Sequence, residues 1–182
     1  MTQNYKSVSL DRTAAELVAV TGEQRLSGIV DELKRQNITL SSAESCTGGL
    51  VGKLLTDISG VSAVYLGGVI SYTNDIKINI LGVDPETIEK YTEVSPETAK
   101  EMAECVREKF SSDIGVSVTG FAGPGGGNDR DPVGTVYIAV ATKDATKILR
   151  LSLDSQMDRA SIRRTAAHVI FALVERVVKA CP

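Results

Sequence analysis

Residues 38–58 read I-T-L-S-S-A-E-S-C-T-G-G-L-V-G-K-L-L-T-D-I, and this stretch decides the fold. Its first six residues, 38–43, are typical of a short β-strand, whereas residues 48–58 place apolar side chains at helical spacing. The turn between them contains a serine, a cysteine and a threonine followed by two glycines. A strand that passes through such a turn into a helix begins a β-α-β unit, which predicts parallel strands covered by helices.

The same alternation of strands and helices continues along the chain. Strands are expected at 63–72, 113–119, 133–142 and 147–153, and helices at 24–35, 74–81, 84–91, 94–110 and 158–180. The strand at 63–72 is almost continuously apolar, which predicts burial on both faces. The last two strands are about four residues apart and predict an antiparallel hairpin. We therefore expect an α/β fold, a three-layer α/β/α sandwich on a mixed, mostly parallel sheet of about five strands.

Composition restricts the classes of partner. The length of 182 residues suggests one domain, which we place at 23–182 after an N-terminal extension at 1–22. The net charge of −3 gives no reason to expect nucleic acid or an anionic membrane. No apolar run approaches the ~18 residues of a membrane span. The chain start lacks the apolar core of a signal peptide, so a cytoplasmic location is expected. Three cysteines and one histidine form neither a disulfide framework nor a zinc pattern, so no metal is expected.

Three polar side chains end three of the predicted strands. Ser45 follows the strand at 38–43, Tyr72 closes the next strand, and Thr119 closes the strand at 113–119. If these strands are parallel, the three side chains lie along one carboxyl edge of the sheet. Open α/β sheets bind their ligands at that edge. The topology alone thus predicts a site there, independently of any motif.

The turn after the first strand has three interpretations that the sequence leaves open. Ser45 could be a nucleophile, with the free N–H groups from Cys46 to Gly49 holding the oxyanion that forms on the attacked carbonyl. The same N–H groups could cradle a phosphate, with Gly48 and Gly49 allowing close approach. Alternatively, Ser45 or Thr47 only caps the following helix.

A serine nucleophile needs a base, and the sequence offers one candidate in the right region. Lys77 ends S-Y-T-N-D-I-K at 71–77, in the first turns of a predicted helix, where the helix field and desolvation would lower its pKa. His168 is a weaker candidate because it is mid-helix and distant in sequence. Cys46 is a rival nucleophile, since a helix N-terminus favours a thiolate.

Two further features are candidates for holding a ligand. The loop G-F-A-G-P-G-G-G at 120–127 is not a Walker A motif, but its backbone N–H groups could wrap a ligand. Arg159 and Arg163 are four residues apart on one face of the last helix and could grip a phosphate. A plain surface loop and a solvated basic helix face are the structural alternatives.

Four of these segments together resemble the CinA C-terminal domain family, whose enzymatic members include the PncC-type nicotinamide-nucleotide amidohydrolases. They are A-E-S-C-T-G-G at 43–49, G-G-V-I-S-Y-T-N-D-I-K at 67–77, V-S-V-T-G-F-A-G-P-G-G-G at 116–127 and P-V-G-T-V-Y-I-A-V at 132–140. The resemblance covers roughly residues 25–180. One departure is Met157, which precedes Asp158 and Arg159 where the family often has glycine.

The resemblance implies hydrolysis of the carboxamide of nicotinamide mononucleotide to nicotinate mononucleotide and ammonia. It assigns Ser45, Tyr72 and Lys77 to catalysis and implies neither a metal nor an organic cofactor. The substrate-binding residues that we expect are Cys46, Thr47, Gly48, Gly49, Asn74, Thr119, Gly120, Ala122, Gly123, Arg159 and Arg163. The expected partners are this small nucleotide and further copies of the chain, with a homodimer as the default. The alternative is a catalytically silent nucleotide-binding module with the same fold.

Overall fold

This computed structural model describes residues 5–180, apart from the side chains of residues 12, 16, 17, 19, 20, 23 and 24. The strands are β1 (Lys6–Leu10), β2 (Leu40–Glu44), β3 (Tyr65–Ile70), β4 (Ile114–Gly120), β5 (Thr135–Ala141) and β6 (Thr146–Leu153). The α-helices are α1 (Arg12–Gln36), α2 (Leu50–Thr56), α3 (Asn74–Ile76), α4 (Pro85–Tyr91), α5 (Pro96–Phe110) and α6 (Arg159–Val178). A 3-10 turn, η1 (Val61–Ala63), and a π-helical turn, η2 (Lys77–Leu81), complete the regular structure.

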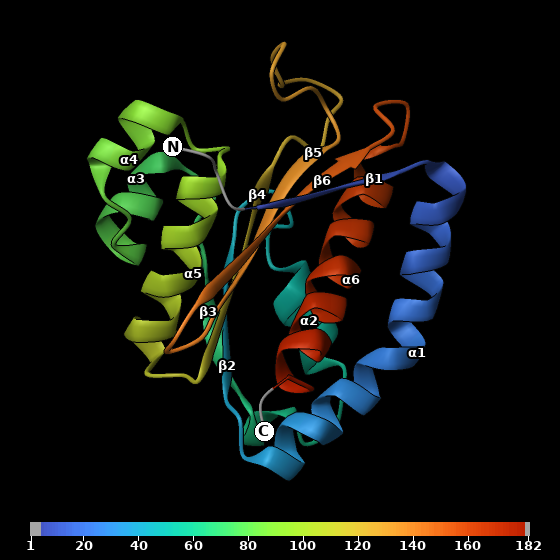
Figure 1. Ribbon diagram of the computed structural model, residues 1–182, viewed down its shortest axis with the longest axis vertical. Helices are drawn as coiled ribbons and strands as arrows, with labels where there is room; N and C mark the ends of the chain where they lie inside the picture. The colour runs from blue at the N-terminus through green and yellow to red at the C-terminus, as the bar shows by residue number, and fades with distance from the viewer. Residues whose placement is uncertain (1–4, 181–182) are drawn as a thin grey trace.

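The strands form one six-stranded sheet in the order β1-β6-β5-β4-β2-β3. β2 pairs in parallel with both β3 and β4, and β1 pairs in parallel with β6, whereas β5 is antiparallel to its two neighbours. Helices α3, α4 and α5 lie on one side of the sheet and α1, α2 and α6 on the other (Figure 1). The predicted three-layer α/β/α sandwich is therefore confirmed, and so is the hairpin of the last two sheet strands.

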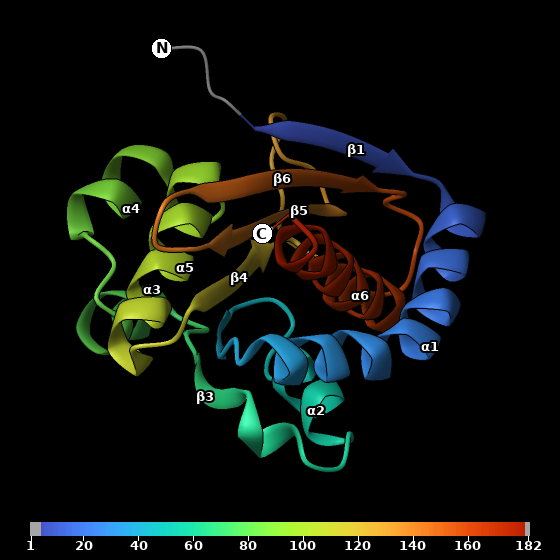
Figure 2. The same ribbon diagram turned by 60° about the horizontal axis from the view of Figure 1, so that its bottom comes forward.

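The sheet differs from the prediction at both of its edges (Figure 2). The additional sixth strand is β1, which lies in the expected extension and pairs with β6, while residues 1–4 and 181–182 lie outside the described residues. The expected boundary at residue 22 falls inside α1. The prediction that the strand at 63–72 is buried on both faces was wrong. β3 is an edge strand whose residues alternate between half-buried and exposed. Its continuous apolar run therefore does not correspond to burial on both faces.

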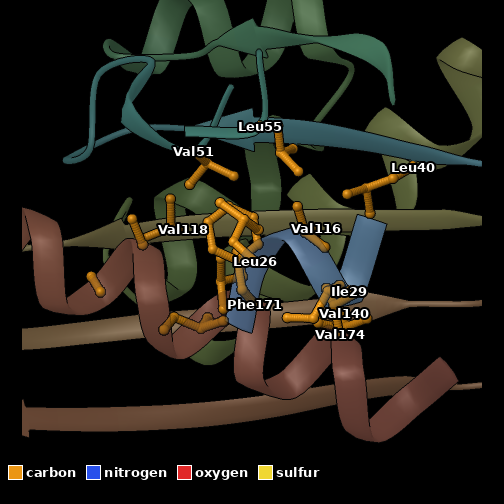
Figure 3. Close-up of a cluster of buried hydrophobic side chains, with 14 of the residues drawn as sticks. Leu26, Ile29, Leu40, Val51, Leu55, Val116, Val118, Val140, Phe171 and Val174 are labelled. Carbon is orange, nitrogen blue, oxygen red and sulfur yellow. The ribbon is translucent and has the colours of Figure 1, made fainter. Parts of the chain in front are cut away.

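Alternation along the central strands divides the interior into two faces. Val116 and Val118 of β4 join the large core with side chains of α1, α2 and α6, as Figure 3 shows. The intervening residues face α5, where Ser117 Oγ donates to Ala99 O and a Cβ on Gly115 would lie 2.1 Å from Ala103 O. Both faces are covered, which explains why β4 and β5 are almost entirely buried. Among the described residues no helix is both long and apolar enough to cross a membrane.

The carboxyl ends of β2, β3 and β4 meet at one edge of the sheet because these strands are parallel. The start of α6 and the glycine-rich connection from β4 to β5 lie at this same end, at the top of Figure 1. Residues from four separate parts of the chain can therefore converge there, as the topology predicted.

Candidate active site

Ser45 and Lys77 form a buried pair at the carboxyl edge of the sheet. Lys77 Nζ lies 3.1 Å from Ser45 Oγ and donates a hydrogen bond of 2.8 Å to Ser71 O. Ser45 is 8% exposed and Lys77 is fully buried at 0%. Burial lowers the pKa of Lys77 from the ordinary 10.5, although the nearby Glu93 carboxylate and Cys46 oppose the shift. A neutral lysine in hydrogen-bonding distance of a serine hydroxyl can accept its proton.

Local structure brings Lys77 into this position. Thr73 caps α3 by accepting from Ile76 N, which turns the chain back over the sheet after β3. The helix then widens into the π-helical turn η2, which begins at Lys77. The Lys77 carbonyl accepts from both Gly82 N and Val83 N, and Lys77 N donates to Thr73 O, so the backbone at Lys77 is fixed on both sides. A π-helical turn of this kind is often found at functional sites.

The structure reveals one residue of the site that sequence reasoning missed. Glu44, the last residue of β2, is buried, and its carboxylate accepts hydrogen bonds from Gly49 N, Val51 N and Gly52 N. These are N–H groups of the first turn of α2 and its N-cap, Gly49, whose own side chain offers no cap. The interpretation of Ser45 or Thr47 as the helix cap was therefore wrong. An acidic residue at the end of a buried strand, five residues before the helix N-cap, was the available signal.

Few N–H groups of the turn remain for a ligand. Gly48 N donates to Ser45 O, Ser45 N donates to Val118 O, and Gly49 N is taken by Glu44. Within the described part of the chain, the N–H groups of Cys46 and Thr47 donate to no other residue. A phosphate cradle formed by the first turn of α2 is excluded, because a buried carboxylate already occupies it.

Cys46 has the wrong environment for a nucleophile. Its side chain is buried at 6% exposure, and this burial raises the pKa of the thiol to about 12. Its own backbone N–H and the nearby basic side chains of Arg159, Lys77 and Arg163 lower that pKa, but they do not outweigh desolvation. A thiolate is therefore disfavoured at neutral pH, which argues for Ser45 as the nucleophile.

The two predicted arginines make different contacts at the rim of the site. Arg159 Nη2 donates to Tyr72 Oη at 3.0 Å, and Arg159 Nη1 donates to Gly123 O at 2.8 Å. Arg159 thus joins the end of β3 to the glycine-rich loop from an exposed position. Arg163 instead donates to Thr47 O and holds the turn itself. Tyr72 is 56% exposed, and no hydrogen bond within the described residues joins it to Ser45 or Lys77.

The remaining predicted residues lie at or just beyond the ends of β3 and β4 and make contacts of their own. Thr119 Oγ1 donates to Glu93 O, which ties β4 to the segment before α5. Ala122 is buried in the large core, and Gly120 lies against β5, where a Cβ would come within 2.6 Å of Thr135 O. Asn74 is exposed at the start of α3. Within the described residues, no group of three or more histidine, cysteine or acidic side chains could hold a metal ion.

Comparison with known proteins places the chain in a family. A model described as the CinA C-terminal domain matches residues 23–178. The chain belongs to the CinA C-terminal domain family. Among curated relatives, a competence-damage inducible protein of Acetivibrio thermocellus is 50% identical over 142 residues, 78% of this chain and 34% of that protein. A CinA-like protein of Cytophaga hutchinsonii is 48% identical over 147 residues, 81% of this chain and 35% of that protein.

Solved structures of the CinA family share the fold. The competence/damage inducible protein CihA from Agrobacterium tumefaciens superposes with a TM-score of 0.83 at 33% identity, covering 87% of this chain and 95% of that one. The competence damage-inducible protein A from Klebsiella pneumoniae gives 0.84 at 27% identity, covering 88% and 99%. The chain spans only about a third of the length of the curated relatives named above, at 34% and 35%. The resemblance found in the sequence is therefore confirmed for this domain.

Proposed function

We propose that this CinA-family domain is a serine amidohydrolase that converts nicotinamide mononucleotide and water to nicotinate mononucleotide and ammonia. The observation that carries the proposal is the buried contact of 3.1 Å between Lys77 Nζ and Ser45 Oγ. A fully buried lysine with a lowered pKa is costly for a fold, and such groups cluster at functional sites. Membership of the CinA family supports the reaction class.

The mechanism follows from the protonation states of this pair. Neutral Lys77 accepts the Ser45 proton as Ser45 Oγ attacks the carboxamide carbon. The N–H groups of Cys46 and Thr47, which have no other partner among the described residues, stabilise the oxyanion. Lys77 then gives its proton to the departing nitrogen, which leaves as ammonia. A water molecule, deprotonated by Lys77, hydrolyses the nicotinoyl ester and restores Ser45.

Substrate binding is assigned to the rim. Arg159 is exposed, and its contacts with Tyr72 and the carbonyl of Gly123 hold its guanidinium at the rim. Of the two arginines it is therefore the better placed to bind a phosphate. Arg163 is committed to Thr47 O. Tyr72 thereby acts through Arg159 on the substrate and not as a relay for the Ser45 proton.

Ammonia release tests the proposal directly. Purified, chelator-treated protein is incubated with nicotinamide mononucleotide, beside Ser45→Ala, Lys77→Ala and the exposed-lysine control Lys53→Ala. We expect release by the wild type and by Lys53→Ala only. Turnover in a folded Ser45→Ala protein would refute the serine mechanism. No release, with the nucleotide still raising the melting temperature, would identify a silent nucleotide-binding module.

We also propose that the protein forms a homo-oligomer, with a dimer as the default. In support, β3 lies at a sheet edge, and two of its large apolar side chains are exposed, Leu66 at 42% and Ile70 at 56%. Exposed apolar side chains on an edge strand are typical of association surfaces. Size-exclusion chromatography with light scattering at micromolar concentration is the test, and a monomer would overturn the proposal.

A further inference from the structure

Glu44 is a buried carboxylate that the proposed chemistry does not use. It is 2% exposed, and it accepts from Gly49 N and Val51 N at 3.0 Å each and from Gly52 N at 2.8 Å. A carboxylate that accepts several backbone N–H groups makes strong, charge-assisted hydrogen bonds. Glu44 directly precedes Ser45 in the chain, so its charge lies next to the proposed nucleophile.

Alternation along β2 separates the two consecutive side chains. Successive residues of a strand point to opposite faces of the sheet. Ser42 Oγ is hydrogen-bonded to Tyr65 Oη, and Glu44, on the same face, reaches α2. Ser45 lies on the other side, against Lys77. No hydrogen bond within the described residues joins Glu44 to Lys77, so Glu44 is neither the base nor the partner of the base.

The turn between Glu44 and α2 is held from two directions by opposite charges. The Glu44 carboxylate holds the N–H groups at the start of α2, and Arg163 donates to Thr47 O. The helix also packs closely here, because a Cβ on Gly52 would lie 2.9 Å from Tyr65 Oη and 3.6 Å from Glu44 Oε1. The peptides of Cys46 and Thr47 therefore lie between two fixed points.

We propose that Glu44 is a positioning residue that fixes the nucleophile turn and supplies an internal anion to the first turn of α2. Two consequences follow, and both rest on the proposed function. The N–H groups of Cys46 and Thr47 are the donors of this turn left to an oxyanion, and Glu44 sets their direction. A substrate phosphate is excluded from α2 and has to bind elsewhere, at the rim arginine.

The test compares Glu44→Gln with Leu151→Ala, a buried core change on β6 away from the turn. Glutamine keeps the shape of Glu44 but removes the charge and turns an NH₂ group toward backbone N–H donors. We expect kcat with nicotinamide mononucleotide to fall at least about tenfold, with KM changed less than about threefold, since misplaced oxyanion donors act in the transition state. Leu151→Ala should lower the melting temperature while retaining the kcat of the wild type.

A second readout does not depend on the identity of the substrate. A fluorophosphonate probe labels an activated serine and places its oxygen in the oxyanion position, and intact mass measures the rate of labelling. We expect labelling of Ser45 in the wild type and in Leu151→Ala, and labelling at least about tenfold slower in Glu44→Gln. If Glu44→Gln does not fold, Glu44→Asp, which withdraws the carboxylate by one methylene, takes its place with the same expected direction.

The outcomes separate the two proposals. Labelling of the wild type without ammonia release would overturn the choice of substrate. The labelling rates of the wild type and the Glu44 variant would then decide alone whether Glu44 positions the turn. Equal labelling rates in the wild type and a folded Glu44 variant would overturn the positioning role alone. An equal loss of kcat in Leu151→Ala would reduce Glu44 to a stabilising residue. Neither labelling nor ammonia release in the wild type would overturn both proposals.

Discussion

Replacing Lys77 with methionine should change the pH dependence of stability in a defined way. Methionine fills a similar volume and has no titrating group. In the folded protein burial lowers the pKa of Lys77, whereas the unfolded chain keeps the ordinary value of 10.5. Between the lowered folded pKa and 10.5, the unfolded wild type therefore binds one proton more than the folded protein. Wild-type stability rises with pH across that window, and the contribution is absent from Lys77→Met.

The slope of this effect is fixed by the proton count. One proton of difference corresponds to about 1.4 kcal/mol of unfolding free energy per pH unit. Across the window between the lowered folded pKa and 10.5, the stability of Lys77→Met relative to the wild type should therefore fall as the pH rises, at up to this rate. The variant also leaves Ser71 O without its hydrogen bond of 2.8 Å, a cost of about 1–3 kcal/mol. That cost shifts the difference in unfolding free energy between the two proteins by the same amount at every pH, so the slope of the difference against pH is unchanged.

Urea unfolding of both proteins at several pH values measures the slope. Lys53→Met is the matched control, because the Lys53 side chain is 63% exposed and should show no such slope. Burial raises the pKa of Cys46 to about 12 and that of Cys105 to about 11, which lowers stability above pH 9 in every variant and therefore largely cancels in the difference. A difference that stays constant from pH 7.5 to 9.5 would mean that Lys77 is charged in the folded protein, which removes it as the general base.

Three further predictions follow from the contacts around the site and the sheet. Cys46→Ala should retain most of the wild-type kcat, and iodoacetamide at pH 8 should leave ammonia release unchanged, because burial raises the pKa of this thiol to about 12; activity lost in step with alkylation would contradict this. Tyr72→Phe should raise KM more than it lowers kcat, since the hydroxyl accepts a hydrogen bond from Arg159. Steady-state kinetics measure both constants, and an effect confined to kcat would instead support Tyr72 as a relay for the Ser45 proton. Asp131 is buried and forms an ion pair with Arg150 at 3.2 Å. Asp131→Ala should lower the unfolding free energy by about 3–5 kcal/mol, because Arg150 loses this carboxylate partner, and a loss below about 1 kcal/mol in urea unfolding would show that the pair contributes little.

The sequence predicted the parts of the site that depend on topology. Ser45 and Lys77 are 32 residues apart, yet both were placed at one edge because β-α-β connections make neighbouring strands parallel. It did not predict β1, whose five residues, K-S-V-S-L, are exposed in four positions and include only two apolar side chains. Such an edge strand is held by backbone pairing with β6, which no side-chain periodicity reports.

Partner choice was also beyond the sequence. The spacing of Arg159 and Arg163 predicted the same role for both, a grip on a phosphate. In the structure Arg159 donates to Gly123 O, 36 residues away, and Arg163 donates to Thr47 O, 116 residues away. These contacts depend on where α6 begins relative to the end of β2. The function of Glu44 was missed for a similar reason. Its three donors belong to a helix start whose residue and direction only the folded turn defines.

The end of β2 combines two opposed electrostatic requirements in two consecutive residues. A neutral lysine base needs a dry environment without an anion in direct contact, because a carboxylate in contact would restore its charge. The helix start at α2 needs an anion, because its N–H groups are otherwise unsatisfied. Alternation along the strand meets both requirements, since Glu44 and Ser45 point to opposite faces of the sheet. A carboxylate moved by one position along the strand would face Lys77, raise its pKa and remove the base, which is a physical reason for this order of glutamate and serine.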